Sequence, residues 1–328
     1  MKALVARGYG GAEVLEVADV PVPLPGAGQI QVRIAAAGLN PADLRIVSGA
    51  FKDSVPLEFP HVLGSDFAGT VTAVGPEVGR FSPGDEIFGL GQARAAGSMA
   101  SLVSSPPSFT TGTMAEYAVF DADTPALALR PAELPAEHAA SLPVTALTAL
   151  PLLRAGDFAR GTKALVIGAA GGVGGAVVPL LAAQGVHVIA TAIPSDEGYV
   201  RGLGASETID YRSADVAAET RTRHPDGIDA LVNLALPGTA LPALATVVRP
   251  GGRLLNIAFP SPDPSTGFET VYTNARPGDL EEVAALAVKG VLPSTVTRRY
   301  PPAEAAQAYW DLEHEHVRGK LLVTAVDA

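Results

Sequence analysis

Apolar and polar positions alternate over short runs between residues 1 and 90. Two clear examples are "QIQVRIAAAG" at 29–38 and "FAGTVTAVG" at 67–75, and turn sequences rich in proline and glycine, such as "VPLPGAG" and "RFSPGDE", separate these runs from their neighbours. A period of two is typical of strands that bury one face. The pattern therefore predicts an all-β region at the start of the chain.

From about residue 125 the pattern changes to helical segments that alternate with short apolar runs. These runs are "KALVIGA", "HVIAT", "ALVNLAL" and "GRLLNIAF". Strands that are apolar on both sides and separated by helices predict a parallel sheet covered by helices. We expect an α/β fold with a β domain at 1–124, a doubly wound domain at 125–262, and a return to the first domain at 263–328.

The last of these regions has a mixed pattern. It holds an amphipathic segment at Asp279–Lys289, a second helix start after Pro301-Pro302, and the closing run "KLLVTAV", which reads as a strand. A long segment without clear structure, residues 91–112, is rich in Gly, Ala, Ser, Pro and Thr. Such segments are either surface loops or lids over a substrate, and both interpretations stay open.

Composition narrows the range of functions. The chain has 328 residues, too many for one ordinary core, and a formal net charge of −11 without a basic run, which argues against nucleic acid and anionic membrane as partners. It has no cysteine, so cysteine-ligated zinc is excluded. No apolar run reaches the length of a membrane span and no signal-peptide pattern is present, and we expect a cytoplasmic protein.

A cluster of small residues directly follows the run "KALVI". It reads Ala169-x-Gly171-x-x-Gly174 and leads into a helical pattern and then a second apolar run. A glycine turn between a strand and a helix lets a pyrophosphate approach bare backbone amides at the helix N-terminus. A glycine-rich packing turn is the alternative. We predict a dinucleotide site that includes Ala169, Gly171, Gly172, Val173 and Gly174.

The end of the second strand distinguishes NAD from NADP. An NAD site requires an acid there to bind the ribose hydroxyls, but the sequence has Thr191-Ala192-Ile193. We therefore expect NADP(H), with Thr191 at the site and Arg201, Tyr211 and Arg212 as candidates for the 2′-phosphate. Asp196 argues in the other direction, because its charge would repel a phosphate.

The order of several stretches along the chain resembles one family. The stretches are "GLNPADLRIVSG", "HVLGSDFAGTVTAVGPEVGRFSPGDEIFG", "GTMAEYAVF", "AASLPVTALTA", the glycine turn, "VRPGGRLLNIA" and "HVRGKLLVT". They resemble the medium-chain dehydrogenase/reductase superfamily, in its zinc-free quinone oxidoreductase-like (zeta-crystallin-like) branch. The resemblance implies a GroES-like β-barrel catalytic domain built from both chain ends, a Rossmann domain between them, an active site in the cleft, and a homodimer.

The resemblance also implies that no catalytic metal is bound. Zinc-dependent relatives have a cysteine where Asn40 stands and Gly-His-Glu where Gly64-Ser65-Asp66 stands. What remains is hydride transfer from NADPH to a quinone or to the activated C=C of an α,β-unsaturated carbonyl, whose developing negative charge needs a hydrogen-bond donor and a proton.

Candidate residues for this reaction lie in the stretch "NPADLR". The resemblance implies substrate-side roles for Asn40 and Asp43, three residues apart on one helical turn; an Asx turn before Pro41 is the structural alternative for Asn40. Arg45 stands where many relatives have a tyrosine, and it is either a ligand for an enolate or an exposed helix charge.

Further cofactor contacts follow from the resemblance alone. They are Thr148, Asn233, Ile257 in "Asn256-Ile257-Ala258", and Lys320. Two other functions stay open: a pathway-specific tailoring enoyl reductase with residues 91–112 as its lid, and a dinucleotide-binding protein without catalysis.

Overall fold

The computed structural model describes residues 1–53, 56–91 and 112–325. The segment predicted as a loop or lid, 91–112, therefore lies outside the described residues except for Gly91 and Gly112. No helix in the described ranges is long and apolar enough to cross a membrane.

The chain forms two compact units. The first comprises residues 1–147, 274–289 and 294–328, and the second comprises 148–273 and 290–293.

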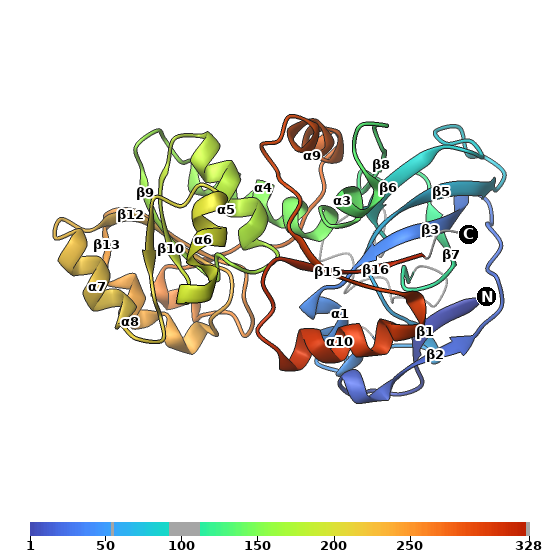
Figure 1. The fold of residues 1–328 in the computed structure, drawn as a ribbon, viewed down its shortest axis with the longest axis horizontal. Coiled ribbons are helices and arrows are strands. Elements are labelled where there is room, and N and C mark those ends of the chain that lie inside the picture. The colour runs from blue at the N-terminus through green and yellow to red at the C-terminus, as the bar shows by residue number, and fades with distance from the viewer. Residues whose placement is uncertain (54–55, 92–111, 326–328) are drawn as a thin grey trace. The chain divides into compact units, whose positions relative to one another are not determined.

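The described part of the first unit is built on two β-sheets (Figure 1). The larger has the order β15-β16-β3-β5-β6-β8, with β7 also paired to β3, and the smaller has the order β2-β1-β4. Leu322 pairs with Gly38, so the C-terminal strand β16 lies antiparallel to β3, and one sheet holds strands from the N-terminal and C-terminal parts of the chain. The strands are β1 (Lys2–Ala6), β2 (Leu15–Asp19), β3 (Gln29–Gly38), β4 (His61–Val62), β5 (Asp66–Val74), β6 (Glu86–Leu90), β7 (Tyr117–Asp121), β8 (Leu127–Leu129), β15 (Val296–Tyr300) and β16 (Lys320–Thr324).

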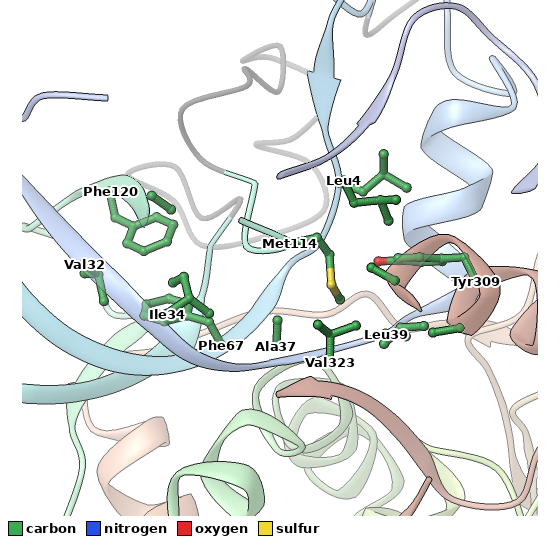
Figure 2. Packing of buried hydrophobic residues seen from close by; sticks show 14 of the residues in the cluster. Leu4, Val32, Ile34, Ala37, Leu39, Phe67, Met114, Phe120, Tyr309 and Val323 are labelled. Atoms are coloured by element: carbon green, nitrogen blue, oxygen red, sulfur yellow. The ribbon is translucent and has the colours of Figure 1, made fainter. Parts of the chain in front are cut away.

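Inward-facing residues of these strands make the core of this unit together with residues outside them, such as Tyr309 of α10 and Met114 (Figure 2). The rings of Phe67 and Phe120 stack with centroids 4.4 Å apart, and Ile30 and Val32 of β3 are buried beside them. The alternating pattern of the sequence thus places its apolar positions on the buried face.

Helices close the first unit. They are α1 (Pro41–Val47), α3 (Ala136–Ala140), α9 (Asp279–Val288) and α10 (Ala305–His314), while α4 (Pro143–Gly156) contains the residues at which the chain passes to the second unit. The predicted helices at Asp279–Lys289 and after Pro302 are confirmed. Short 3-10 helices lie at Ala12–Val14 and Pro302–Glu304 in this unit, and at Gly238–Ala240 and Pro264–Thr266 in the second.

The second unit contains a parallel sheet with the order β11-β10-β9-β12-β13-β14. Helices α5 and α6 lie on one face, and α7 and α8 on the other (Figure 1). This is the doubly wound arrangement that the strand–helix alternation predicts. Its elements are β9 (Lys163–Ile167), α5 (Gly174–Ala183), β10 (His187–Thr191), α6 (Pro194–Gly202), β11 (Glu207–Ile209), α7 (Val216–Arg223), β12 (Ile228–Asn233), α8 (Pro242–Ala245), β13 (Val248–Asn256) and β14 (Glu269–Thr270).

The units divide at other residues than the sequence predicted. The expected boundaries were 124/125 and 262/263, whereas the contacts divide the chain at 147/148 and 273/274. The reason is pairing over long sequence distances. Strand β8 pairs with β6, which holds residues after 125 in the first unit, and β14 pairs with β13, which holds residues after 262 in the second.

Candidate functional site

The glycine turn connects β9 to α5 at the carboxyl end of the parallel strands. Gly168 has a φ of +80°, a conformation that side chains disfavour. The N–H of Gly171 donates to the carbonyl of Gly168 at 3.2 Å, and α5 begins three residues later at Gly174. The turn therefore directs the chain from the strand into the helix in the way the motif predicts.

Two glycines of the turn have different surroundings. A Cβ on Gly174 would lie 2.3 Å from the carbonyl oxygen of Ala169, so this residue must be small for the helix to pack. A Cβ on Gly171 would meet nothing nearer than 3.5 Å. Within the described part of the chain, the N–H groups of Gly172 and Val173 have no hydrogen-bond partner. Exposed amides at a helix N-terminus fit a pyrophosphate.

Thr191 holds this turn against the sheet. Its hydroxyl donates to the carbonyl of Val166 at 3.4 Å and accepts the N–H of Gly168 at 3.2 Å. The side chain is buried. Thr191 thus positions the first residue of the turn, and both of its hydrogen bonds go to the protein.

The residues after β11 lie beside the end of β10. Thr191 pairs with Ile209, and the N–H of Ala192 donates to the carbonyl of Ile209 at 3.0 Å. Tyr211 and Arg212 follow after Asp210 and are exposed. They are placed at the edge of the sheet where a dinucleotide ribose binds in this fold class. Asp196, which argued against a phosphate, is buried at 3% exposure.

Arg201 lies elsewhere. Its guanidinium donates to Glu197 at 2.8 Å, to the carbonyl of Ser206 at 3.2 Å and to the hydroxyl of Thr208 at 3.2 Å. It stands in the last turn of α6, which runs away from the carboxyl edge of the sheet. This placement does not support the predicted contact of Arg201 with a 2′-phosphate.

Asn233 and Ile257 lie at the carboxyl ends of β12 and β13. The side-chain amide of Asn233 donates to Asn256 Oδ1 at 2.7 Å and to the carbonyl of Leu236 at 2.8 Å, and the N–H of Ile257 donates to the carbonyl of Asn233 at 3.0 Å. These bonds tie the strand ends together. Thr148 is buried and shares a hydrogen bond of 2.7 Å with the hydroxyl of Thr273.

In the first unit, a buried charged cluster joins three segments far apart in sequence. The ammonium of Lys320 donates to Asp66 Oδ2 at 2.7 Å and also to the amide oxygen of Asn40. The amide nitrogen of Asn40 donates to Asp66 Oδ2 at 3.1 Å, and the N–H of Val144 donates to Asp66 Oδ1 at 2.7 Å. Lys320 is 3% exposed. Its charge is thus engaged within the first unit, and the predicted contact with cofactor has no support from this geometry.

Asp43 belongs to a second buried group beside this one. It accepts hydrogen bonds from Ser65 Oγ at 2.6 Å, Tyr309 Oη at 2.8 Å and the N–H of Asn40 at 3.0 Å. Burial raises the pKa of Asp43 to about 6, although the bonds from Ser65 and Tyr309 oppose this shift. Burial also raises the pKa of Tyr309, and the nearby charge of Asp43 adds to the shift.

The helix α1 explains why Asn40 and Asp43 lie together. Pro41 occupies the first turn, and the Asp43 carboxylate caps the N–H of Asn40, as acids at this position of a helix do. Arg45 is half-buried on the same helix. The structure therefore brings Asn40 and Asp43 together but places both among internal partners.

Sequence reasoning missed Ser65, Asp66 and Tyr309 as members of these clusters. In the sequence, the first two stand out only as replacements of a zinc motif. The sequence does offer one signal for Asp66 and Lys320, which is their charge. They are the acid and the base within the two apolar strands that flank β3, and charged residues pair when they are buried. Nothing in the run "AAQAYWDLEH" singles out Tyr309.

Comparison with known proteins places the chain in a family. Residues 26–130 match the alcohol dehydrogenase GroES-like domain, and residues 203–323 match the zinc-binding dehydrogenase domain. The chain belongs to the medium-chain dehydrogenase/reductase superfamily, in its quinone oxidoreductase-like branch. The resemblance noted in the sequence is thereby confirmed, and so is the fold of a GroES-like domain with a Rossmann-like parallel-sheet domain.

Two relatives from Arabidopsis thaliana are similar over almost the whole chain. The chloroplast envelope quinone oxidoreductase homolog is 30% identical over 98% of this chain and 98% of its own length. The chloroplastic NADPH-dependent alkenal/one oxidoreductase is 31% identical over 98% of this chain and 79% of its own length.

Solved structures give the same family. The quinone oxidoreductase of Coxiella burnetii superimposes with a TM-score of 0.86 at 25% identity and covers 99% of both chains. A structure described as an NAD-dependent alcohol dehydrogenase superimposes with a TM-score of 0.85 at 31% identity and covers 99% of this chain and all of its own.

The family description includes zinc, and the residues at the corresponding positions do not fit it. Catalytic zinc takes cysteine, histidine and carboxylate donors. Here Asn40 and Asp66 are both bonded to the ammonium of Lys320, and Ser65 donates to Asp43. A positive charge between the two candidate ligands opposes a divalent cation.

Proposed function

We propose that the chain is an NADPH-dependent, zinc-independent oxidoreductase. It transfers a hydride to a quinone or to the activated C=C of an α,β-unsaturated carbonyl. One observation carries the proposal: the Lys320 ammonium lies between Asn40 and Asp66, at the positions where zinc-dependent relatives hold their metal. In those relatives the metal polarises the carbonyl or lowers the pKa of the bound alcohol, whereas hydride addition to a conjugated acceptor needs no such metal.

The glycine turn supports a dinucleotide as the hydride source. The bound nicotinamide supplies the hydride. The free N–H groups of Gly172 and Val173 bind the pyrophosphate, and the hydrogen bond between Thr191 and the N–H of Gly168 fixes the turn to the end of β10. The choice of NADPH over NADH rests on the lack of an acid at the end of β10 and on Tyr211 and Arg212 at the end of β11. The Arg212 charge and the Tyr211 hydroxyl bind the 2′-phosphate.

On the substrate side, Arg45 is the donor that the proposal requires. A conjugated carbonyl gathers negative charge on its oxygen as hydride arrives at the β-carbon, and a guanidinium stabilises that charge. Arginine holds its proton too tightly to act as an acid. The proton that completes the reduction therefore comes from water.

The proposed preference for NADPH over NADH is tested by calorimetric titration of the full chain with each cofactor. Replacing Arg212 with Gln removes a charge-assisted hydrogen bond, so NADPH affinity should fall by about 10- to 100-fold while NADH affinity stays unchanged. The matched control is Arg253→Gln, which removes an exposed charge from β13. Equal losses for NADPH and NADH, or a preference of the unaltered protein for NADH, would overturn the assignment.

The proposed class of hydride acceptor is tested by following NADPH oxidation with a panel of substrates. We expect turnover with a quinone, an enal or an enone in the presence of a metal chelator, and none with saturated ketones. An enoyl thioester in the same panel tests the tailoring reductase alternative. Activity confined to saturated carbonyls would refute the proposal, and so would loss of activity in the chelator by a chain that circular dichroism shows to be folded. A cytoplasmic location and a homodimer stay predictions.

A further inference from the structure

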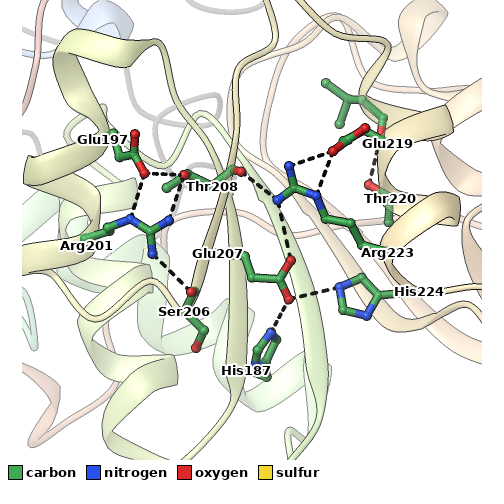
Figure 3. A network of polar contacts seen from close by, with 11 residues as sticks. His187, Glu197, Arg201, Ser206, Glu207, Thr208, Glu219, Thr220, Arg223 and His224 are labelled. Carbon is green, nitrogen blue, oxygen red and sulfur yellow. Dashed lines mark hydrogen bonds and ion pairs between the residues drawn. The ribbon is translucent and has the colours of Figure 1, made fainter.

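A second group of titratable side chains lies in the second unit, away from the glycine turn. The carboxylate of Glu207 stands between the imidazoles of His187 and His224 (Figure 3). His187 Nε2 is 2.6 Å from Glu207 Oε1, and His224 Nε2 is 3.1 Å from the same oxygen. In the part of the chain that the structure describes, this is the one group of three such residues whose donor atoms all lie within 4.8 Å of one another.

The fold brings these three residues to one edge of the sheet. His187 is the first residue of β10, and Glu207 is the first residue of β11. His224 directly follows α7, a helix that runs back from the carboxyl edge to the amino edge. The cluster therefore lies at the amino ends of the strands, opposite the edge that carries the glycine turn.

The environment of His224 points to a ligand. The residue is 8% exposed, and its Nε2 makes no hydrogen bond of regular geometry among the described residues, because Glu207 Oε1 at 3.1 Å contacts it only as an ion pair. A buried imidazole nitrogen without a well-formed hydrogen bond is unfavourable. The side chain of His187 is 39% exposed, which leaves one side of the cluster accessible from solvent.

Arg223 orients the carboxylate. Its Nη1 lies 3.5 Å from Glu207 Oε2, and it is itself held by Glu219 at 2.7 Å and by the carbonyl of Thr208 at 2.9 Å. One carboxylate oxygen thus faces Arg223 and the other faces both imidazoles. Burial acts to raise the pKa of Glu207, but the hydrogen bond from His187 and the charge of His224 hold it below the usual value.

We propose that His187 Nε2, Glu207 Oε1 and His224 Nε2 bind a divalent transition-metal ion such as Zn²⁺. Two imidazoles and one carboxylate form a donor set that zinc accepts, with water in the fourth position. Donor atoms about 2.0–2.1 Å from one ion stand about 3.3 Å apart, so the His187–Glu207 contact lengthens as the ion enters. The ion links β10, β11 and the end of α7 and stabilises the second unit. The proposal is independent of the proposed function.

The test uses the full chain without a histidine tag, stripped of metal by a chelator. Calorimetric titration with ZnCl₂ should show one equivalent bound, and Co²⁺ should give the visible absorption of a tetrahedral site with nitrogen and oxygen donors. Zn²⁺ should also raise the thermal unfolding temperature, whereas Mg²⁺, which prefers oxygen ligands, should not.

Variants locate the site. His187→Gln and His224→Gln should each weaken Zn²⁺ binding at least about tenfold, because even the partners of metal ligands contribute that much. His314→Gln is the matched control, since this exposed histidine also has a glutamate nearby, at 4.0 Å. Absence of a bound equivalent in the unaltered protein, or Zn²⁺ affinities of both variants equal to that of the control, would overturn the proposal. The Co²⁺ spectrum of the unaltered chain decides the matter even if a variant fails to fold.

Discussion

Asp43 accepts three hydrogen bonds in the interior of the first unit, from Ser65, Tyr309 and the N–H of Asn40. Three residues before Asp43, Asn40 joins Asp66 and Lys320 in a second buried cluster. At the residue scale, both clusters satisfy polar groups that would be costly to bury alone. Their side chains join α1, β5, α10 and β16, so they connect both ends of the chain.

The raised pKa of Asp43 makes stability depend on pH. The folded protein favours the protonated form of Asp43. The contribution of this residue to the free energy of unfolding is therefore complete below pH 3.8, the pKa of Asp43 in the unfolded chain, and is lost as the pH rises through about 6. The loss amounts to about 3 kcal/mol. Asp43→Asn has no such titration, and its free energy of unfolding should not show that loss.

Urea unfolding of both proteins at a series of pH values checks this prediction. Burial lowers the pKa of His61 to about 4. This residue therefore lowers the free energy of unfolding as the pH falls below 6.5, whereas Asp43 lowers it as the pH rises. Because His61 is present in both proteins, the difference between the two profiles isolates Asp43. Parallel profiles would show that Asp43 does not titrate in this range.

The buried pair of Lys320 and Asp66 gives a second prediction. Lys320→Met leaves the Asp66 carboxylate buried without its cation, and the free energy of unfolding should fall by about 3–5 kcal/mol. Lys320→Met combined with Asp66→Asn should recover a large part of this loss. The pair of Lys2 and Asp19 has the same separation of 2.7 Å but is exposed, so Lys2→Met should change stability little. Equal effects of the two lysine variants would contradict the role of burial.

At the element scale, the strands and helices with strong periodicity were predictable from sequence. The strand "KALVI", the glycine turn, α9 and α10 follow from local patterns. The short strands β8 and β14 were not predictable as members of their sheets. Each has only two or three residues, and such a run acquires its place from pairing with a distant strand. The same limit explains the shifted unit boundaries.

Alanine should have different effects at two glycines of the turn: it should lower stability at Gly174 and NADPH affinity at Gly171. Gly174→Ala would place its methyl 2.3 Å from the carbonyl of Ala169, and overpacking of this kind lowers stability by about 1–3 kcal/mol. Gly171→Ala meets nothing nearer than 3.5 Å, so stability should change by at most about 0.5 kcal/mol. Its methyl would still occupy the surface that a pyrophosphate approaches, and NADPH affinity should fall at least about tenfold.

Urea unfolding and calorimetric titration with NADPH separate the two effects. Gly198→Ala is the control, because Gly198 lies in the interior of α6 with nothing within 4 Å of a Cβ. That variant should gain about 0.5–1 kcal/mol of stability and bind NADPH normally. Unaltered NADPH affinity in Gly171→Ala would remove the turn from the cofactor site.

At the scale of the whole molecule, the family membership was predictable because the order of several stretches was visible in sequence. The two buried clusters were not, because Lys320 meets Asn40 across 280 positions and no local pattern records that contact. The histidine–glutamate group at the amino edge of the second unit was missed for the same reason. Its members start two neighbouring strands and end one helix, and only the sheet order β11-β10 makes them neighbours.

The carbon that receives the hydride distinguishes reduction of the activated C=C from reduction of the carbonyl. The full chain is incubated with an enal and with NADPH that carries deuterium at the transferable position of its nicotinamide, in the presence of a metal chelator, and the product is analysed by NMR. Hydride transfer to the activated C=C should place deuterium on the β-carbon of a saturated aldehyde whose carbonyl is intact. Deuterium on the former carbonyl carbon, in an allylic alcohol, would refute the proposed reaction.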